Sequence, residues 1–101
     1  MKLVIVTAVE EYKKSIVSLF KKAGIQNFSE SEIDGYKNGN MLIKASNWFG
    51  GERGGNESIL FFSFTEAVHI ETLFSLIKAF NTNLETNNPV KAVVVPIERY
   101  I

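Results

Sequence analysis

The run Ser58–Phe64 (Ser-Ile-Leu-Phe-Phe-Ser-Phe) most limits how this chain can fold. Successive residues of a β-strand point to opposite faces of a sheet. The two faces would therefore carry Ile59, Phe61 and Ser63 on one side and Leu60, Phe62 and Phe64 on the other. A strand with one face in water alternates apolar and polar residues, and this run does not. We predict a central strand that is apolar on both faces.

Two further segments share this character. Leu3–Val6 (Leu-Val-Ile-Val) and Ala92–Val95 (Ala-Val-Val-Val) are short runs rich in β-branched residues, which are enriched in strands. We predict a strand from Lys2 to Val9 and a last strand from Val90 to Ile97. Because Pro96 lacks a backbone N–H, this last strand is expected at a sheet edge.

Two apolar stripes at three- and four-residue spacing predict amphipathic helices. The first stripe is Tyr12, Ile16, Leu19, Phe20 and Ala23, and the second is Ile70, Leu73, Phe74, Ile77 and Phe80. Glu10–Glu11 suit the start of the first helix, and Lys21–Lys22 followed by Gly24 suit its end. For the second helix we expect Thr65 as the N-cap with Glu66 in the first turn, and the polar segment Asn81–Pro89 as its end.

The segment between the first helix and the long run contains a polar strand and an unusually long connection. Glu30, Glu32 and Asp34 alternate with other residues, so in a strand their carboxylates share one face, as suits a sheet edge. The residues Tyr36–Glu57 then form a connection of about twenty residues, and loops longer than about 12–15 residues are usually functional or disordered. Within it, Met41–Ala45 is a candidate strand extension.

The order β-α-β-β-α-β predicts an α+β, ferredoxin-like domain over residues 1–101. Its four-stranded antiparallel sheet would have both helices on one face and the first and third strands in the centre. The other face would expose large apolar side chains, each worth roughly 1.5–3 kcal/mol when buried. We therefore expect the chain to self-associate through this face.

Composition excludes several classes of function. Eleven basic and eleven acidic residues cancel, so there is no electrostatic case for a nucleic-acid partner. The absence of cysteine excludes disulfides and thiolate chemistry. The sequence also has neither a signal peptide nor an apolar run of about 18 or more residues, so we expect no membrane insertion and a cytoplasmic location.

The chain resembles the PII signal-transduction proteins, within the superfamily that also contains CutA. The resemblance lies in Met1–Val4 opening a strand, Gly24–Ile25 after the first helix, Gly35–Tyr36 before the long loop, and Lys91 leading through a β-branched strand into Pro96–Glu98. It covers essentially the whole chain and rests on layout more than on single motifs. It implies a homotrimer with a nucleotide between subunits and a partner-docking T-loop.

The resemblance implies which residues form the ligand cleft. These are Gly35, Tyr36, Lys37, Lys91 and Glu98. It also implies an adenine nucleotide as the ligand, although Asn81–Pro89 replaces the family's glycine-rich phosphate loop with a segment that contains no glycine. Ordinary ATP binding is therefore expected to be lost. The basic C-terminal segment of the family is missing, and the loop has no tyrosine beyond Tyr36 as a uridylylation target.

Within the long loop, Trp48, Phe49 and Arg53 are the candidate partner contacts, because aromatic and arginine residues concentrate at interaction hot spots. The alternative is that the two aromatic side chains fold back onto the protein. Gly50–Gly55 could cradle an anion, but phosphate loops follow a strand and this run precedes one, so a flexible loop is favoured. The partner would be a transporter or an enzyme.

No constellation of residues indicates catalysis, and we expect a protein that is not an enzyme. His69 is the single histidine, and a surface role is favoured over a metal site. Glu30, Glu32 and Asp34 are interpreted as a solvated edge rather than a cation site, so no metal is assigned.

We therefore expect a PII-like trimeric regulator that senses a small ligand and acts through the 36–57 loop. A CutA-like trimer linked to divalent-metal tolerance is the alternative, because Trp48–Glu52 is distantly similar to the aromatic segment of that family. A small-molecule enzyme on the same scaffold is a third reading, which the fold by itself does not exclude.

Overall fold

The computed structural model describes residues 1–37, 40–41, 57–84 and 88–101. Its main sheet contains β1 (Lys2–Val9), β2 (Ser29–Asp34), β5 (Glu57–Thr65) and β6 (Lys91–Pro96). The strand order is β2-β5-β1-β6 and every neighbouring pair is antiparallel. The predicted ferredoxin-like sheet is confirmed, with the first strand and the Ser58–Phe64 strand in the centre.

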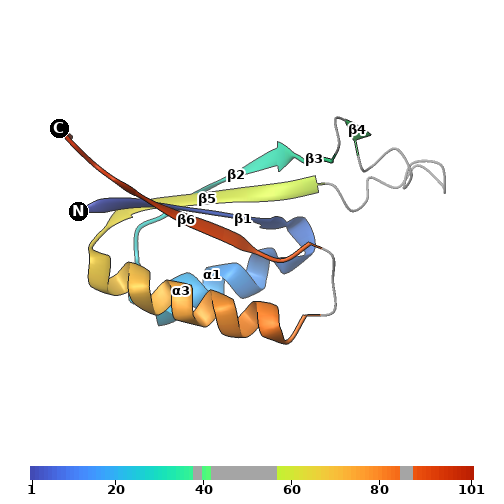
Figure 1. Ribbon diagram of the computed structural model, residues 1–101, viewed down its shortest axis with the longest axis horizontal. Coiled ribbons are helices and arrows are strands. Elements are labelled where there is room, and N and C mark those ends of the chain that lie inside the picture. The colour runs from blue at the N-terminus through green and yellow to red at the C-terminus, as the bar shows by residue number, and fades with distance from the viewer. Residues whose placement is uncertain (38–39, 42–56, 85–87) are drawn as a thin grey trace.

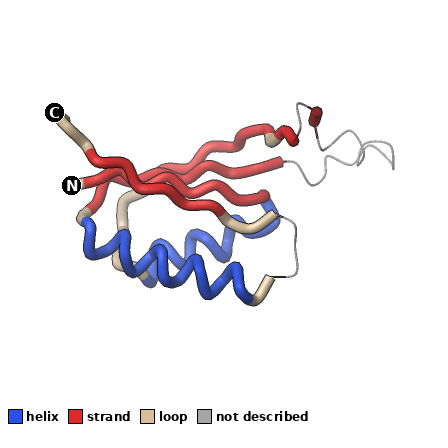
Figure 2. The backbone as a smooth tube through the Cα atoms, viewed as in Figure 1, coloured by secondary structure: helices blue, strands red, loops and turns tan. Residues whose placement is uncertain are grey.

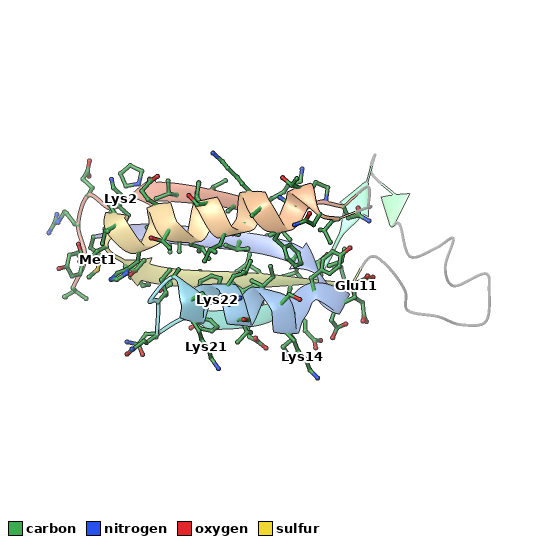
Figure 3. The ribbon with its side chains drawn as sticks, turned by 90° about the horizontal axis from the view of Figure 1, so that it is seen from below. Met1, Lys2, Glu11, Lys14, Lys21 and Lys22 are labelled. Carbon is green, nitrogen blue, oxygen red and sulfur yellow. The ribbon has the colours of Figure 1, made fainter. Side chains whose placement is uncertain are left out.

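Both long helices lie on the same side of this sheet (Figure 1). A 3-10 turn, η1 (Glu10–Tyr12), leads into α1 (Lys13–Lys22), and α3 (Ala67–Thr82) follows β5. Seen from the helix side, Lys14 and Lys21 project outward from α1 (Figure 3). Neither helix among the described residues has the length and hydrophobicity needed to span a membrane.

The core fills the space between the helices and the sheet. Its largest fully buried side chains are Phe20, Phe61, Ile16, Ile25, Ile59, Ile70, Leu73, Val4 and Val6. The ring of Phe20 packs against those of Phe28 and Phe61, with centroid separations of 4.6 and 5.6 Å. Both predicted apolar stripes therefore face the sheet, and β1 and β5 each contribute alternate residues to the same core.

The opposite sheet face carries rows of apolar side chains. In register, Phe62, Ile5 and Val93 form one row across the sheet. Phe64 and Val95 flank Leu3 in the next row. No described helix or loop covers this face (Figure 2), and Phe64 and Val93 are 55% and 52% exposed. The two-faced pattern of the central strands is confirmed, and we call this surface the open face.

The start of the second helix differs from the prediction. Thr65 is not the N-cap, because it pairs with Lys2 of β1 and is the last residue of β5. Glu66 occupies the N-cap instead, without a side-chain cap hydrogen bond. The strand pairing extends one residue further than the sequence suggested, and this displaces the cap.

Candidate functional site at the root of the long loop

The two sides of the long loop leave the sheet next to each other. Asp34, the last residue of β2, lies opposite Glu57, the first residue of β5. Beyond Gly35, the short strand β3 (Tyr36–Lys37) pairs with β4 (Asn40–Met41). The root of the loop is therefore held by regular structure on both sides and projects from one end of the sheet (Figure 1).

Within one chain, the five predicted ligand residues lie in separate places. Gly35, Tyr36 and Lys37 are consecutive at the loop root, on the β2 edge of the sheet. Lys91 begins β6 on the other edge, opposite Thr7, and the strand register places Thr7 towards the same end of the sheet as the loop root. Glu98 is exposed and lies beyond the far end of β6, after about 17 Å of strand. A cleft containing all five residues would have to combine more than one copy.

The proposed partner contacts Trp48, Phe49 and Arg53 lie outside the described residues, as does the glycine-rich run Gly50–Gly55. Of the candidate strand extension Met41–Ala45, the structure describes Met41, in β4. These assignments stay predictions.

The sequence analysis missed an acidic pocket at the loop root. This pocket of about 210 Å³ is lined by Glu10, Glu32, Ile33, Asp34, Glu57 and Ser58. Its carboxylates come from η1, β2 and β5. The alternation of Glu32 and Asp34 indicated that they share a face, but only the register of β2 on β5 brings Glu57 beside them, and only the end of β1 brings Glu10.

The carboxyl groups in this pocket affect one another. A hydrogen bond with the Glu57 side chain raises the pKa of Glu10 above its ordinary value of 4.5, and desolvation and the negative charges of Glu57 and Glu32 act in the same direction. Lys13 opposes this rise. The Nζ atom of Lys13 lies 2.8 Å from a carboxylate oxygen of Glu30, and this contact raises the pKa of Lys13.

Glu30, the remaining acidic residue of β2, forms the ion pair with Lys13. Among the residues that the structure describes, no group of three or more histidine, cysteine or acidic side chains could hold a metal ion. The Glu30–Lys13 pair links β2 to the start of α1, and the exposure of β2 agrees with a solvated edge strand.

His69 has a structural contact. Its Nδ1 atom lies 3.1 Å from the carbonyl oxygen of Ala23, at the end of α1, and the side chain is half-buried. A Cβ atom on Gly24 would lie 3.0 Å from the same nitrogen. His69 therefore joins α3 to the end of α1 and is not the exposed side chain that the sequence suggested.

One side chain joins the end of α3 to the residue that precedes β6. Asn81 Nδ2 donates to the carbonyl oxygen of Val90 over 2.9 Å, and the backbone N–H of Val90 donates to Asn81 Oδ1, also over 2.9 Å. This pair of hydrogen bonds ties the end of α3 to the residue before β6. The amide N–H of Val90 is already engaged and is not free to bind a phosphate.

Comparison with known proteins shows the fold. No protein-family model and no curated protein matches the sequence. Solved structures do match. A protein described as PII-like signalling, from Thermus thermophilus, is 18% identical with a TM-score of 0.60, over 95% of this chain and 85% of that one. A DUF3240 family protein from Shewanella baltica is 18% identical with a TM-score of 0.66, over 98% and 91% of the two chains.

A third structure carries ligands in its description. CPII, a nitrogen regulatory PII-like protein from Thiomonas intermedia bound to ADP, AMP and bicarbonate, is 14% identical with a TM-score of 0.62, over 99% of this chain and 94% of that one. These neighbours confirm the predicted resemblance to PII-like proteins at the level of the fold. They do not support the CutA-like alternative.

Proposed function

The chain has the fold of PII-like signalling proteins, and on that premise we propose that it is a regulatory protein that works as a homotrimer. A small ligand binds in clefts between subunits, and the 36–57 loop transmits its presence to a partner protein. The observation that carries this proposal is the open face, whose apolar rows have no cover within the described part of the chain.

The open face supports self-association through its chemistry. The two central strands present Leu3 and Ile5 beside Phe62 and Phe64. Large contiguous apolar patches mark interaction sites in soluble proteins. Copies of the same chain are the expected cover, because a small domain gains stability by burying more apolar surface.

Self-association also supplies what the ligand cleft lacks in a single chain. The loop root lies on the β2 edge, whereas Lys91 lies on the β6 edge towards the same end of the sheet. A neighbouring copy in a cyclic assembly brings the β6 edge of one subunit towards the β2 edge of the next. Across the subunit junction, Lys91 of one copy would then face the loop root (Gly35, Tyr36 and Lys37) of the next copy. Glu98 would come from the copy whose β6 ends at this junction.

An adenine nucleotide with few phosphates is the proposed ligand. One structural neighbour is described as bound to ADP and AMP. The segment before β6 argues against a triphosphate, because it has no glycine and the N–H of Val90 already bonds Asn81. Lys91 is exposed and is the cation that would meet a phosphate group.

The partner would be a transporter or an enzyme that contacts Trp48, Phe49 and Arg53 in the long loop, in the cytoplasm. A ligand can shift the loop only as far as it binds the two loop states with different affinities. The position of the loop root next to the proposed cleft provides for such coupling. We propose no catalytic role for the chain.

Calorimetric titration tests the ligand. ATP, ADP, AMP and cyclic AMP are titrated into the wild-type protein, the Lys91→Ala variant and the Lys78→Ala variant, which removes an exposed lysine from α3. We expect heat with AMP or ADP, weaker binding of ATP, loss of binding in Lys91→Ala and unchanged binding in Lys78→Ala. The absence of heat with all four nucleotides would remove the nucleotide from the proposal.

A further inference from the structure

We propose that the carboxyl groups of the acidic pocket act as a proton-dependent clasp on the root of the long loop. In the closed state, a hydrogen bond between Glu10 and Glu57, in which one group holds the proton, ties η1 to the start of β5. In the open state both groups are ionised, and the ends of β2 and β5 are held less firmly. This inference rests on the role proposed above for the 36–57 loop, and it adds a way in which pH would regulate that loop.

The acidic pocket lies where three elements meet. Its carboxylates come from η1 (Glu10), from β2 (Glu32 and Asp34) and from β5 (Glu57), around a volume of about 210 Å³. Asp34 ends β2 and Glu57 begins β5, so the pocket borders both points at which the long connection joins the sheet (Figure 1). A change in the forces between these side chains therefore acts on both ends of the loop.

Like charges in this pocket face one another across the strands. In the register of β2 on β5, Asp34 lies directly opposite Glu57, and like charges in directly opposite positions destabilise a strand pair. Glu32 lies two residues before Asp34 and therefore shares its face of the sheet. Ionisation of all the carboxyl groups in the pocket thus weakens the last pair of the ladder, next to the start of the loop.

Protonation at the Glu10–Glu57 pair relieves this repulsion. The two side chains are joined by a hydrogen bond, and such a bond favours a protonated partner because ionised carboxylates only accept hydrogen bonds. It raises the pKa of Glu10 in the folded chain, so the clasp is closed below the ordinary pKa of 4.5 and opens as the pH rises through the folded value. Both residues are partly exposed, so protons from solvent reach them.

The neighbouring lysine does not remove the acidity of the pocket. The charges that act on Glu10 are those of Glu57 from β5, Glu32 from β2 and Lys13 from the start of α1, and only Lys13 lowers its pKa. The Nζ atom of Lys13 lies 2.8 Å from a carboxylate oxygen of Glu30, so its charge is already shared with a carboxylate outside the pocket. Uptake of a proton by Glu10 is therefore the change that lowers the negative charge of the pocket.

Amide hydrogen exchange, followed by mass spectrometry, tests the clasp. Glu10→Gln keeps a donor towards Glu57 and cannot ionise, so it represents the closed state at every pH. At about pH 7, exchange in peptides that span residues 32–36 and 57–60 should be slower in Glu10→Gln than in the wild type by roughly threefold or more. At about pH 4 the wild-type clasp is also closed, and the two proteins should exchange alike.

Glu71→Gln is the matched control, because Glu71 is exposed on α3 and does not line the pocket. It should exchange like the wild type at both pH values. A peptide from α3 (Ala67–Thr82) distinguishes a local clasp from a general gain in stability. Equal slowing in α3, no slowing at the loop root, or the same slowing in Glu71→Gln would each overturn the inference.

A carboxyl NMR titration measures the coupling within the pair. Glu57→Gln should lower the pH at which Glu10 titrates, because glutamine removes a negative charge and can donate to the ionised Glu10 carboxylate. Glu71→Gln should leave this titration unchanged, and an unchanged Glu10 titration in Glu57→Gln would refute the clasp. The mass of the protein and its nucleotide binding report separately on the proposed function. A nucleotide-binding trimer without slower exchange at the loop root would therefore refute the clasp alone.

Discussion

Glu10 and Glu57 place two carboxyl groups in hydrogen-bond contact at the end of the sheet where the long loop leaves it. A hydrogen bond between two carboxyl groups favours the protonated form, because ionised carboxylates only accept hydrogen bonds. Glu32 adds a further negative charge, while Lys13, paired with Glu30, opposes the effect. The raised pKa means that ionisation of Glu10 is less favourable in the folded protein than in the unfolded chain.

Replacing Glu10 by glutamine should raise the thermal stability at about pH 7. The pKa of Glu10 is raised in the folded protein, so the protonated carboxyl group contributes to the stability of the fold. This contribution is complete below the ordinary pKa of 4.5 and is lost as the pH rises through the folded pKa. Glutamine keeps a donor towards Glu57 and cannot ionise. The increase in Tm measured by calorimetry should disappear below about pH 4.5.

Glu71→Gln is the matched control, because Glu71 is exposed on α3 and does not line the acidic pocket. Its Tm should change little and without this pH dependence. A Glu10→Gln variant that is less stable than the wild type at about pH 7 would contradict the account of this carboxyl pair.

Gly24 is the position where backbone conformation and packing both demand glycine. Its φ is +83°, and an added Cβ would lie 3.0 Å from His69 Nδ1. Gly24→Ala should therefore lower the free energy of unfolding by about 1–2 kcal/mol from the backbone alone, measured by urea denaturation. In a His69→Ala background the crowding is absent, so the same substitution should cost less. No loss of stability in either background would contradict this explanation.

At the level of elements, the side chain of Asn81 joins the end of α3 to the start of β6. Its amide group bonds both the N–H and the carbonyl of Val90, which is itself only 4% exposed. This closure positions Lys91 as the first residue of β6. Two hydrogen bonds thus close the end of α3 onto the start of β6, and Lys91 stays the proposed phosphate contact.

Asn81→Ala should lower the free energy of unfolding by about 1–3 kcal/mol, because it leaves a part-buried N–H and carbonyl without their partner. Asn83→Ala is the control. The side chain of Asn83 bonds the carbonyl oxygen of Ala79 at an exposed position, so its loss should cost about 0.5 kcal/mol. Urea denaturation compares the two variants, and equal losses would argue against the closing role of Asn81.

The elements themselves follow from short-range patterns. The stripes from Ile16 to Phe20 and from Ile70 to Ile77 determine the helices and the face they bury. The double-sided strand Ser58–Phe64 correctly indicated a central strand. The pattern failed at Thr65, where pairing with Lys2 prevailed over the local capping preference.

The site was less predictable than the fold. Its location follows from the length of the connection after Gly35. The acidic pocket does not, because Glu10 and Glu57 are far apart in sequence and meet only once β5 has paired with β2 and β1. Residues that converge through strand register cannot be found by spacing along one chain.

For the whole molecule, the proposed trimer depends on the open face. Introducing a charge there by Phe62→Glu should dissociate the proposed trimer, since an unpaired charge is costly to bury. Val68→Glu is the matched control, because Val68 is an apolar side chain on α3 that is already 66% exposed. Sedimentation velocity should show dissociation for Phe62→Glu and unchanged assembly for Val68→Glu.

The mass of the wild-type protein in solution tests the central claim most directly. Sedimentation equilibrium at micromolar concentration should give a single species of three times the chain mass of 11.3 kDa. A single species at 11.3 kDa would mean that the open face meets water unaided. In that case the clefts between subunits and the regulatory function built on them would both be wrong.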